Sequence, residues 1–185
     1  MKETIALIES LFESRENWEK CAAHPDWRVR YGLAVAIGEK GTKEDIPLLE
    51  QLLKKEEGRP LFNQPAAQYS NCTDDTRLSE YIGPLTMHFD KEYPEETLQA
   101  WQCRGRVYQA VYFSIYKLGY FPDSWKLKTL EFMKTCNDYA VVASMCIALR
   151  CTNDKSIISV LKEIEGTDFC FAFELKKTIR ILSEK

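Results

Sequence analysis

One stretch of this sequence occurs more than once along the chain. Residues 31–38 (YGLAVAIG) align without gaps with residues 112–119 (YFSIYKLG), and the same alignment carries Leu49 onto Leu130 and Glu50 onto Glu131. A third copy follows closer to the C-terminus, with Leu161 in the place of Leu49. Recurrence of this kind is typical of a chain built from one structural unit that stacks on its neighbours.

Each copy has the periodicity of α-helices. Apolar residues return every three or four positions, and no part of the chain shows the sustained alternation of a half-buried strand. Clear apolar stripes occur at Ile46, Leu49, Leu52 and Leu53, and again at Leu127, Leu130 and Met133. The sequence therefore predicts an all-α fold made of helices of about ten to fifteen residues joined by short turns.

Glycines and capping residues mark the turns. We expect Gly38 and Gly41 to follow a helix over about 29–37, and Gly119 to follow the helix that ends at Leu118. Thr42 and Asp45 have the spacing of a capping box that begins the next helix. Asp138 and the pair at 153–154 are similar start signals. Each unit is thus expected to be a helix, a turn and a second helix.

The best copy of the unit resembles a known repeat. Residues 24–38 (HPDWRVRYGLAVAIG), followed by IPLL at 46–49, are similar to a HEAT-like repeat of the bilin-lyase type, with an Asp opening the hairpin and Val-Arg beginning its first helix. The resemblance implies an α-α superhelix, a HEAT-like solenoid of about four to five helical hairpins. We expect it to form a single domain over residues 1–185.

A long segment between the first two copies departs from this pattern. Residues 56–96 hold four of the seven prolines and carry nine acidic but only three basic residues, so the rest of the chain is mildly basic. We expect an irregular acidic insertion here, with a short helix over about 76–81. Long irregular segments in compact domains are usually functional or disordered.

The composition narrows the classes of function. A net charge of −3 and an isoelectric point near 5.6 weigh against a dedicated nucleic-acid binder. The seven cysteines are scattered singly, which favours a reducing, cytoplasmic location. We expect no signal peptide, no membrane partner, no metal and no cofactor. Cys72 and His88 would be the only nucleophile–base pair to consider, and no motif supports it, so no catalytic residue is assigned and an enzyme is not expected.

A group of arginines and aromatic residues supplies the candidate binding residues. Two interpretations of the arginines stay open: they line one groove for an acidic partner, or Arg30 pairs with an Asp of a neighbouring turn and fixes the stacking of the hairpins. For the aromatic residues a role in core packing is favoured, and the alternative is an exposed interface. The candidates are Trp27, Arg28, Arg30, Trp101, Arg104, Arg106 and Tyr108.

Three functions follow from these features, in descending order of support. The first is a protein–protein interaction module or adaptor that uses the solenoid groove and the acidic insertion, with another protein as its partner. The alternative is a HEAT-like nucleic-acid-binding or DNA-repair protein with a basic concave groove, in which Trp27, Trp101, Arg104 and Arg106 contact the nucleic acid. Bilin attachment or isomerisation is suggested by the repeat subfamily alone.

Overall fold

The computed structural model describes residues 2–57, 95–136, 139–164 and 169–185. All regular structure in these ranges is helical, so the predicted all-α class is confirmed for them. Short 3-10 turns precede two of the helices, η1 (Lys43–Asp45) before α4 and η4 (Asp123–Trp125) before α8. The helices are α1 (Lys2–Glu13), α2 (Trp18–Ala22), α3 (Trp27–Lys40), α4 (Ile46–Glu56), α7 (Glu95–Lys117), α8 (Lys126–Thr135), α9 (Tyr139–Leu149), α10 (Ile157–Glu163) and α11 (Phe169–Glu184).

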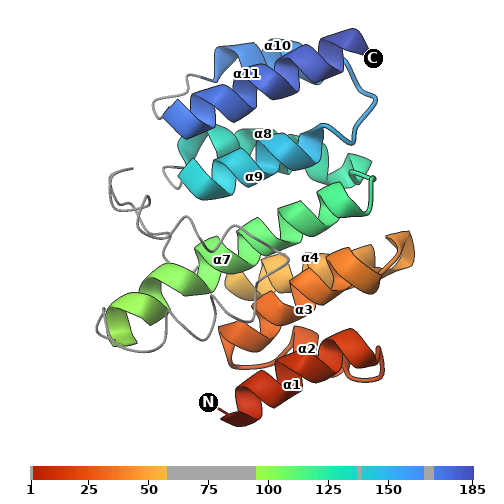
Figure 1. Ribbon diagram of the computed structural model, residues 1–185. Helices are drawn as coiled ribbons and strands as arrows, with labels where there is room; N and C mark the ends of the chain where they lie inside the picture. Colours follow the sequence, from red (N-terminus) through yellow and green to blue (C-terminus); the bar gives the residue numbers. More distant parts are fainter. Residues whose placement is uncertain (1, 58–94, 137–138, 165–168) are drawn as a thin grey trace.

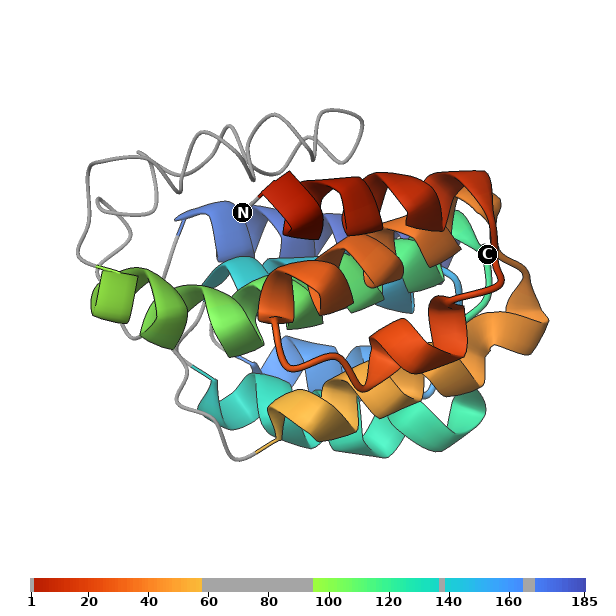
Figure 2. The ribbon, with the colours of Figure 1, turned by 90° about the horizontal axis from the view of Figure 1, so that it is seen from below.

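The helices are stacked in chain order, from α1 at one end to α11 at the other (Figure 1). Seen along the stack, they form two layers (Figure 2). One layer holds α1, α3, α7, α9 and α11, each packed on the next, and the other holds α2, α4, α8 and α10. The first layer is continuous, whereas α4 in the second layer packs mainly on α7 and on α2.

The leucines that the sequence alignment matches are all buried. Leu49, Leu130 and Leu161 occupy equivalent places in α4, α8 and α10, and all three are buried in one hydrophobic core. The first helices of the same three units, α3, α7 and α9, supply the most deeply buried part of that core. The three copies aligned in the sequence therefore correspond to equivalent positions in neighbouring helix pairs.

Gly38 corrects one expected boundary. It lies inside α3, which continues to Lys40, and Gly41 alone follows the helix as its C-cap. A Cβ atom on Gly38 would stand 2.7 Å from the Ser114 Oγ and 3.1 Å from the Ser114 Cα. The Ser114 Oγ in turn lies 2.6 Å from the Ala34 carbonyl oxygen. Gly38 is thus needed for the close approach of α3 and α7, which its sequence context does not reveal.

The turn signals at Gly119 and at Thr42 with Asp45 are confirmed. Gly119 follows α7 with φ of +64°, the left-handed conformation that glycine adopts without strain. Thr42 and Asp45 form the expected capping box, in which the Thr42 backbone N–H donates to the Asp45 carboxylate at 2.8 Å. Pro47 lies in the first turn of α4, where its missing N–H costs little.

Two sequence expectations need correction. The periodicity places Leu127 in the apolar stripe with Leu130 and Met133, but it is 68% exposed while the other two are buried. The expected insertion begins at Glu56, yet Glu56 is the last residue of α4, and Glu95 and Glu96 belong to α7. The interior of that segment, residues 58–94, lies outside the described residues, as do the expected helix at 76–81, the Cys72–His88 pair and the start signal at Asp138.

Polar contacts join successive turns along one edge of the stack. Arg15, between α1 and α2, forms an ion pair with Asp45 in η1, and the Lys126 Nζ lies 3.1 Å from the Asp154 carboxylate in the next turn. The Lys43 Nζ lies 4.9 Å from the centre of the Tyr120 ring. Contacts between successive turns therefore exist, but the expected pairing of Arg30 with an Asp of a neighbouring turn is wrong, because Arg30 binds Glu56 at the end of α4.

Candidate binding pocket

A pocket of about 690 Å³ separates α4 from α8. One face of α4 forms one wall, with Glu50, Leu53, Lys54 and Glu57 at the helical spacing of three and four residues. The opposite wall is formed by η4 and one face of α8, and α7 and α9 close the floor. The residues that form the opposite wall and the floor are Tyr108, Tyr112, Ser124, Trp125, Lys128, Thr129, Glu131, Phe132, Thr135 and Met145.

Aromatic rings of the floor meet aromatic rings of the opposite wall in two pairs. The ring centres of Tyr108 and Phe132 lie 5.7 Å apart, and those of Tyr112 and Trp125 lie 6.3 Å apart in an edge-to-face arrangement. Both separations are in the favourable range for aromatic pairs. The prediction that Tyr108 and Tyr112 belong to the core is confirmed, since both are buried. Both also line the pocket, which therefore lies beside this part of the core.

Hydrogen bonds hold this floor in place. The Tyr112 hydroxyl bonds the Thr129 hydroxyl at 3.0 Å and so ties α7 to α8, while the Tyr108 hydroxyl donates to the Leu53 carbonyl of α4 at 3.4 Å. Burial raises the pKa of Tyr112 far above its usual range, so this phenol stays neutral. Because both walls are attached to α7, the pocket is formed before any ligand arrives.

The rim of the pocket is charged and slightly acidic. Three carboxylates, those of Glu50, Glu57 and Glu131, stand against the two ammonium groups of Lys54 and Lys128. The Lys54 Nζ lies 3.4 Å from the Glu50 carboxylate one helical turn away, so part of this charge is already paired. A pocket with an apolar floor and a few polar groups at its rim is the usual form of a small binding site.

The five candidate residues whose side chains the structure describes do not gather on one surface. Four of them are buried: Trp27, Arg30, Arg106 and Tyr108. Arg28 forms an ion pair with Asp26 at the start of α3. Of the seven, Tyr108 alone is among the described residues that line the pocket. The side chains of Trp101 and Arg104 lie outside the described part of α7.

Arg30 forms a fully buried ion pair instead of lining a groove. Its Nε donates to the carboxylate of Glu56 at the end of α4, and both side chains are 0% exposed. Its Nη1 also donates to the carbonyl oxygens of His24 at 2.6 Å and Pro25 at 2.8 Å. The first helix of this hairpin is therefore clamped both to its own N-terminal turn and to the second helix.

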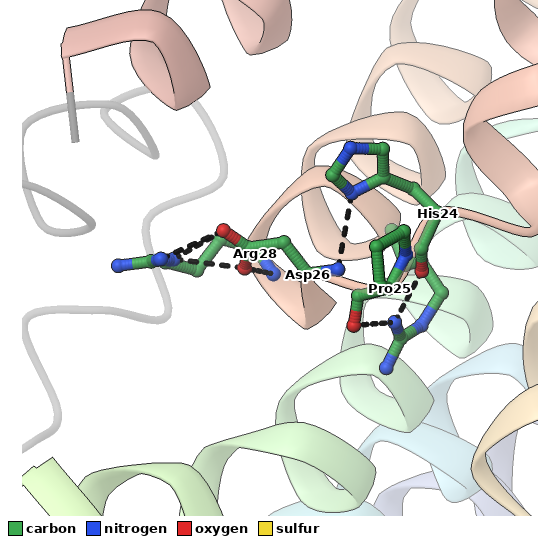
Figure 3. A network of polar contacts seen from close by, with 5 residues as sticks. His24, Pro25, Asp26 and Arg28 are labelled. Atoms are coloured by element: carbon green, nitrogen blue, oxygen red, sulfur yellow. Dashed lines mark hydrogen bonds and ion pairs between the residues drawn. The ribbon is translucent and has the colours of Figure 1, made fainter.

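Arg28 and Asp26 form a local pair at the start of α3 (Figure 3). The Asp26 carboxylate caps the helix by accepting from the Arg28 backbone N–H at 3.0 Å, and it binds the Arg28 guanidinium at 2.7–2.9 Å. His24 Nδ1 accepts from the Asp26 backbone N–H at 3.0 Å. This pairing explains why an arginine is tolerated at the positive end of a helix.

The Asp26 cap leads to a prediction that depends on pH. Burial opposes ionisation of Asp26, but the hydrogen bonds and charge of Arg28 outweigh it, so the pKa falls below 3.8. A lowered pKa stabilises the fold above pH 3.8, and that contribution disappears as the pH falls through the lowered pKa. We expect Asp26→Ala to cost about 1 kcal/mol of unfolding free energy at pH 7, whereas Asp26→Asn, which still caps, should cost less.

Urea denaturation followed by circular dichroism checks this prediction at several pH values between 7 and 2.5. The difference between the original chain and Asp26→Asn should shrink as the pH falls below 3.8, because Asp26 is protonated first in the unfolded chain and then, below its lowered pKa, in the folded chain as well. A difference that stays constant across this range would show that the charge of Asp26 does not stabilise the fold.

The sequence did not predict the pocket, although one signal pointed to it. Glu50 and Glu131 are matched between the first two copies of the repeat, and both line the pocket from equivalent places on α4 and α8. Lys128, Phe132 and Thr135 carry no such signal, because a helix surface facing a pocket has the same periodicity as one facing solvent or core.

The described residues contain no group of three or more side chains that could hold a metal ion. Four cysteines whose side chains the structure describes, Cys21, Cys136, Cys146 and Cys151, are free thiols. Burial raises the pKa of the Cys146 thiol to about 12, so Cys146 behaves as a small core residue. Within the described ranges no helix is both long enough and apolar enough to cross a bilayer.

Comparison with known proteins adds no relative: no family model, no curated protein and no solved structure matches this chain.

Proposed function

We propose that this chain is a protein–protein interaction module and that the pocket between α4 and α8 holds a segment of its partner. The observation that carries the proposal is the position of the pocket, with an aromatic floor and charged walls contributed by two second-layer helices. Aromatic side chains at the bottom of a pocket, surrounded by a polar rim, are the usual anchoring sites in protein interfaces.

The proposal includes a HEAT-like solenoid as the architecture. Its support is the stack of four successive helix pairs within the described residues, α1–α2, α3–α4, α7–α8 and α9–α10, followed by α11. In such a solenoid the second helices line the binding face, and the pocket walls come from two of them. A reducing, cytoplasmic location is part of the same proposal and rests on the scattered cysteines.

The nucleic-acid alternative gains no support from the described residues. Trp27 and Arg106 are 7% and 8% exposed, so neither offers a surface for stacking on a base or for contact with a phosphate. The rim of the pocket carries more carboxylates than ammonium groups, which would repel a phosphate backbone.

Site-specific crosslinking tests the proposed function. A photoreactive benzoylphenylalanine is placed at Thr135 or Lys54, two exposed pocket positions, and in parallel at Leu127, which lies on α8 outside the pocket. After irradiation in a lysate of the source cells, we expect both pocket positions to crosslink the same protein, and Leu127 not to do so. Mass spectrometry of the crosslinked peptide then identifies the bound segment.

A matched pair of phenylalanine variants completes the test. Phe132→Ala removes one wall of the pocket, whereas Phe173→Ala removes a 54% exposed ring on α11. We expect Phe132→Ala to abolish crosslinking from Thr135 and Phe173→Ala to leave it unchanged, with circular dichroism confirming that both variants fold. Equal crosslinking from Leu127 and the pocket positions, or none from the pocket, would refute the proposal.

A further inference from the structure

The pocket is not uniform along its length. Tyr108 is hydrogen-bonded to Leu53 near the end of α4 and its ring contacts that of Phe132 at a tilt of 53°, so this aromatic pair lies beside the last turn of α4. Glu57, the C-cap of α4, lines the same pocket, and Glu131 precedes Phe132 on α8. This end, called the anchor end below, consists of Tyr108, Phe132, Glu57 and the last turn of α4, and Glu131 lines the same pocket from the position next to Phe132.

Three features of the anchor end favour a positive charge. The faces of aromatic rings attract cations, especially those of arginine and lysine. Two carboxylates stand at the rim, and neither is the Glu50 that pairs with Lys54. The C-terminal end of a helix carries partial negative charge, which here comes from the last turn of α4.

The positive groups of the pocket do not offset these features. Lys54 is paired with Glu50 and is 66% exposed, so it is directed along its own helix surface. Lys128 lines the pocket one helical turn before Glu131, so with Lys54 paired to Glu50 the rim keeps one carboxylate in excess. The carboxylates of Glu57 and Glu131 would repel an anionic ligand and attract a cationic one.

We propose that the anchor end of the pocket takes a basic side chain, arginine or lysine, of the partner protein. This inference rests on the proposed function, because it names the chemistry of the segment bound in the same pocket. The aliphatic stem of the side chain would pack against the Tyr108–Phe132 pair, and its charged head would lie at the rim that carries the Glu57 and Glu131 carboxylates. A basic side chain would thus use both the apolar floor and the acidic rim.

The test uses four short peptides that differ at one position, Ac-Gly-Gly-X-Gly-Gly-amide with X as Arg, Lys, Leu or Glu. Binding to the full chain is followed by nuclear magnetic resonance of backbone amides, with peptide concentrations up to about 20 mM because a single side chain binds weakly. We expect the Arg and Lys peptides to shift the amides of Glu57, Tyr108 and Phe132 and the Glu peptide not to, with weaker binding as salt is added.

Glutamine variants separate charge from shape. The double variant Glu57→Gln/Glu131→Gln should weaken binding of the Arg peptide by about fivefold, because two exposed charge contacts are lost. Glu13→Gln, which alters an exposed carboxylate of α1, should leave it unchanged. Equal or tighter binding of the Leu peptide would replace the inference with an apolar anchor. If no peptide shifts the pocket amides although the pocket crosslinks a partner, the inference fails and the proposed function stands.

Discussion

Replacing Arg30 by methionine is expected to lower the free energy of unfolding by about 3–5 kcal/mol, the usual cost of breaking a buried ion pair on one side. The guanidinium is 0% exposed, as is the Glu56 carboxylate that it binds. Without the guanidinium, Glu56 loses the positive charge of Arg30. The carbonyl oxygens of His24 and Pro25 lose a hydrogen-bond donor that lies 2.6 and 2.8 Å from them. Buried groups that lose a partner keep the cost of their desolvation.

The double variant Arg30→Met/Glu56→Met is expected to recover most of this loss, because two apolar side chains avoid the desolvation of two charges. The repeat supports that expectation, since the alignment of the three copies carries Arg30 onto Val111 and Val142, both fully buried. The other two hairpins thus stack with an apolar residue where this one has an ion pair.

Urea denaturation of the single and double variants measures this effect, and Lys54→Met serves as the control. Lys54 also forms an ion pair with a glutamate, but its side chain is 66% exposed, so its loss should cost less than about 1 kcal/mol. If Arg30→Met costs no more than Lys54→Met, or if the double variant is as unstable as the single ones, the buried pair does not stabilise the fold in the way described.

The two leucines of α8 give the second large expected difference. Leu130→Ala should lower the free energy of unfolding by about 2–5 kcal/mol, because Leu130 is 5% exposed and its truncation leaves a cavity. Leu127→Ala should change it by less than about 0.5 kcal/mol, because Leu127 is 68% exposed and loses little contact.

Leu127→Ala is the control for Leu130→Ala, since both variants make the same chemical change in one helix and alter helix propensity equally. Thermal unfolding and urea denaturation of the two variants provide the measurement. Similar losses for the two variants would mean that α8 is rotated relative to the arrangement described, with Leu127 directed toward the core instead of toward solvent.

Local features of the fold were predictable because they depend on neighbouring residues. The capping box of Thr42 and Asp45 and the left-handed Gly119 are both set by short-range hydrogen bonding and backbone sterics, and both are confirmed. The all-α class follows from periodicity over about ten to fifteen residues, which is also local information. The repeat extends this reasoning, because Leu49, Leu130 and Leu161 are buried in equivalent helices.

The candidate site was less predictable because it depends on partners far apart in the sequence. The sequence leaves Arg30 open to a role in a groove or in a ladder between turns, yet its partner is Glu56, a residue that the composition assigns to the acidic insertion. Asp45 and Lys126 provide turn-to-turn contacts instead. Residue type and spacing indicate that an arginine needs a partner, but not which of 28 acidic residues supplies it.

The sequence alone determined the helical class, the positions of most turns and the repetition of the helix pair. Each of these follows from the spacing of apolar residues and turn residues along the chain. Tertiary structure decided that Gly38 allows α3 to approach α7, that Leu127 faces outward, and that α4 and α8 are held apart above Tyr108 and Tyr112. The physical reason is that burial and pocket formation depend on which helices become neighbours and at what rotation, and one amphipathic pattern is compatible with several such arrangements.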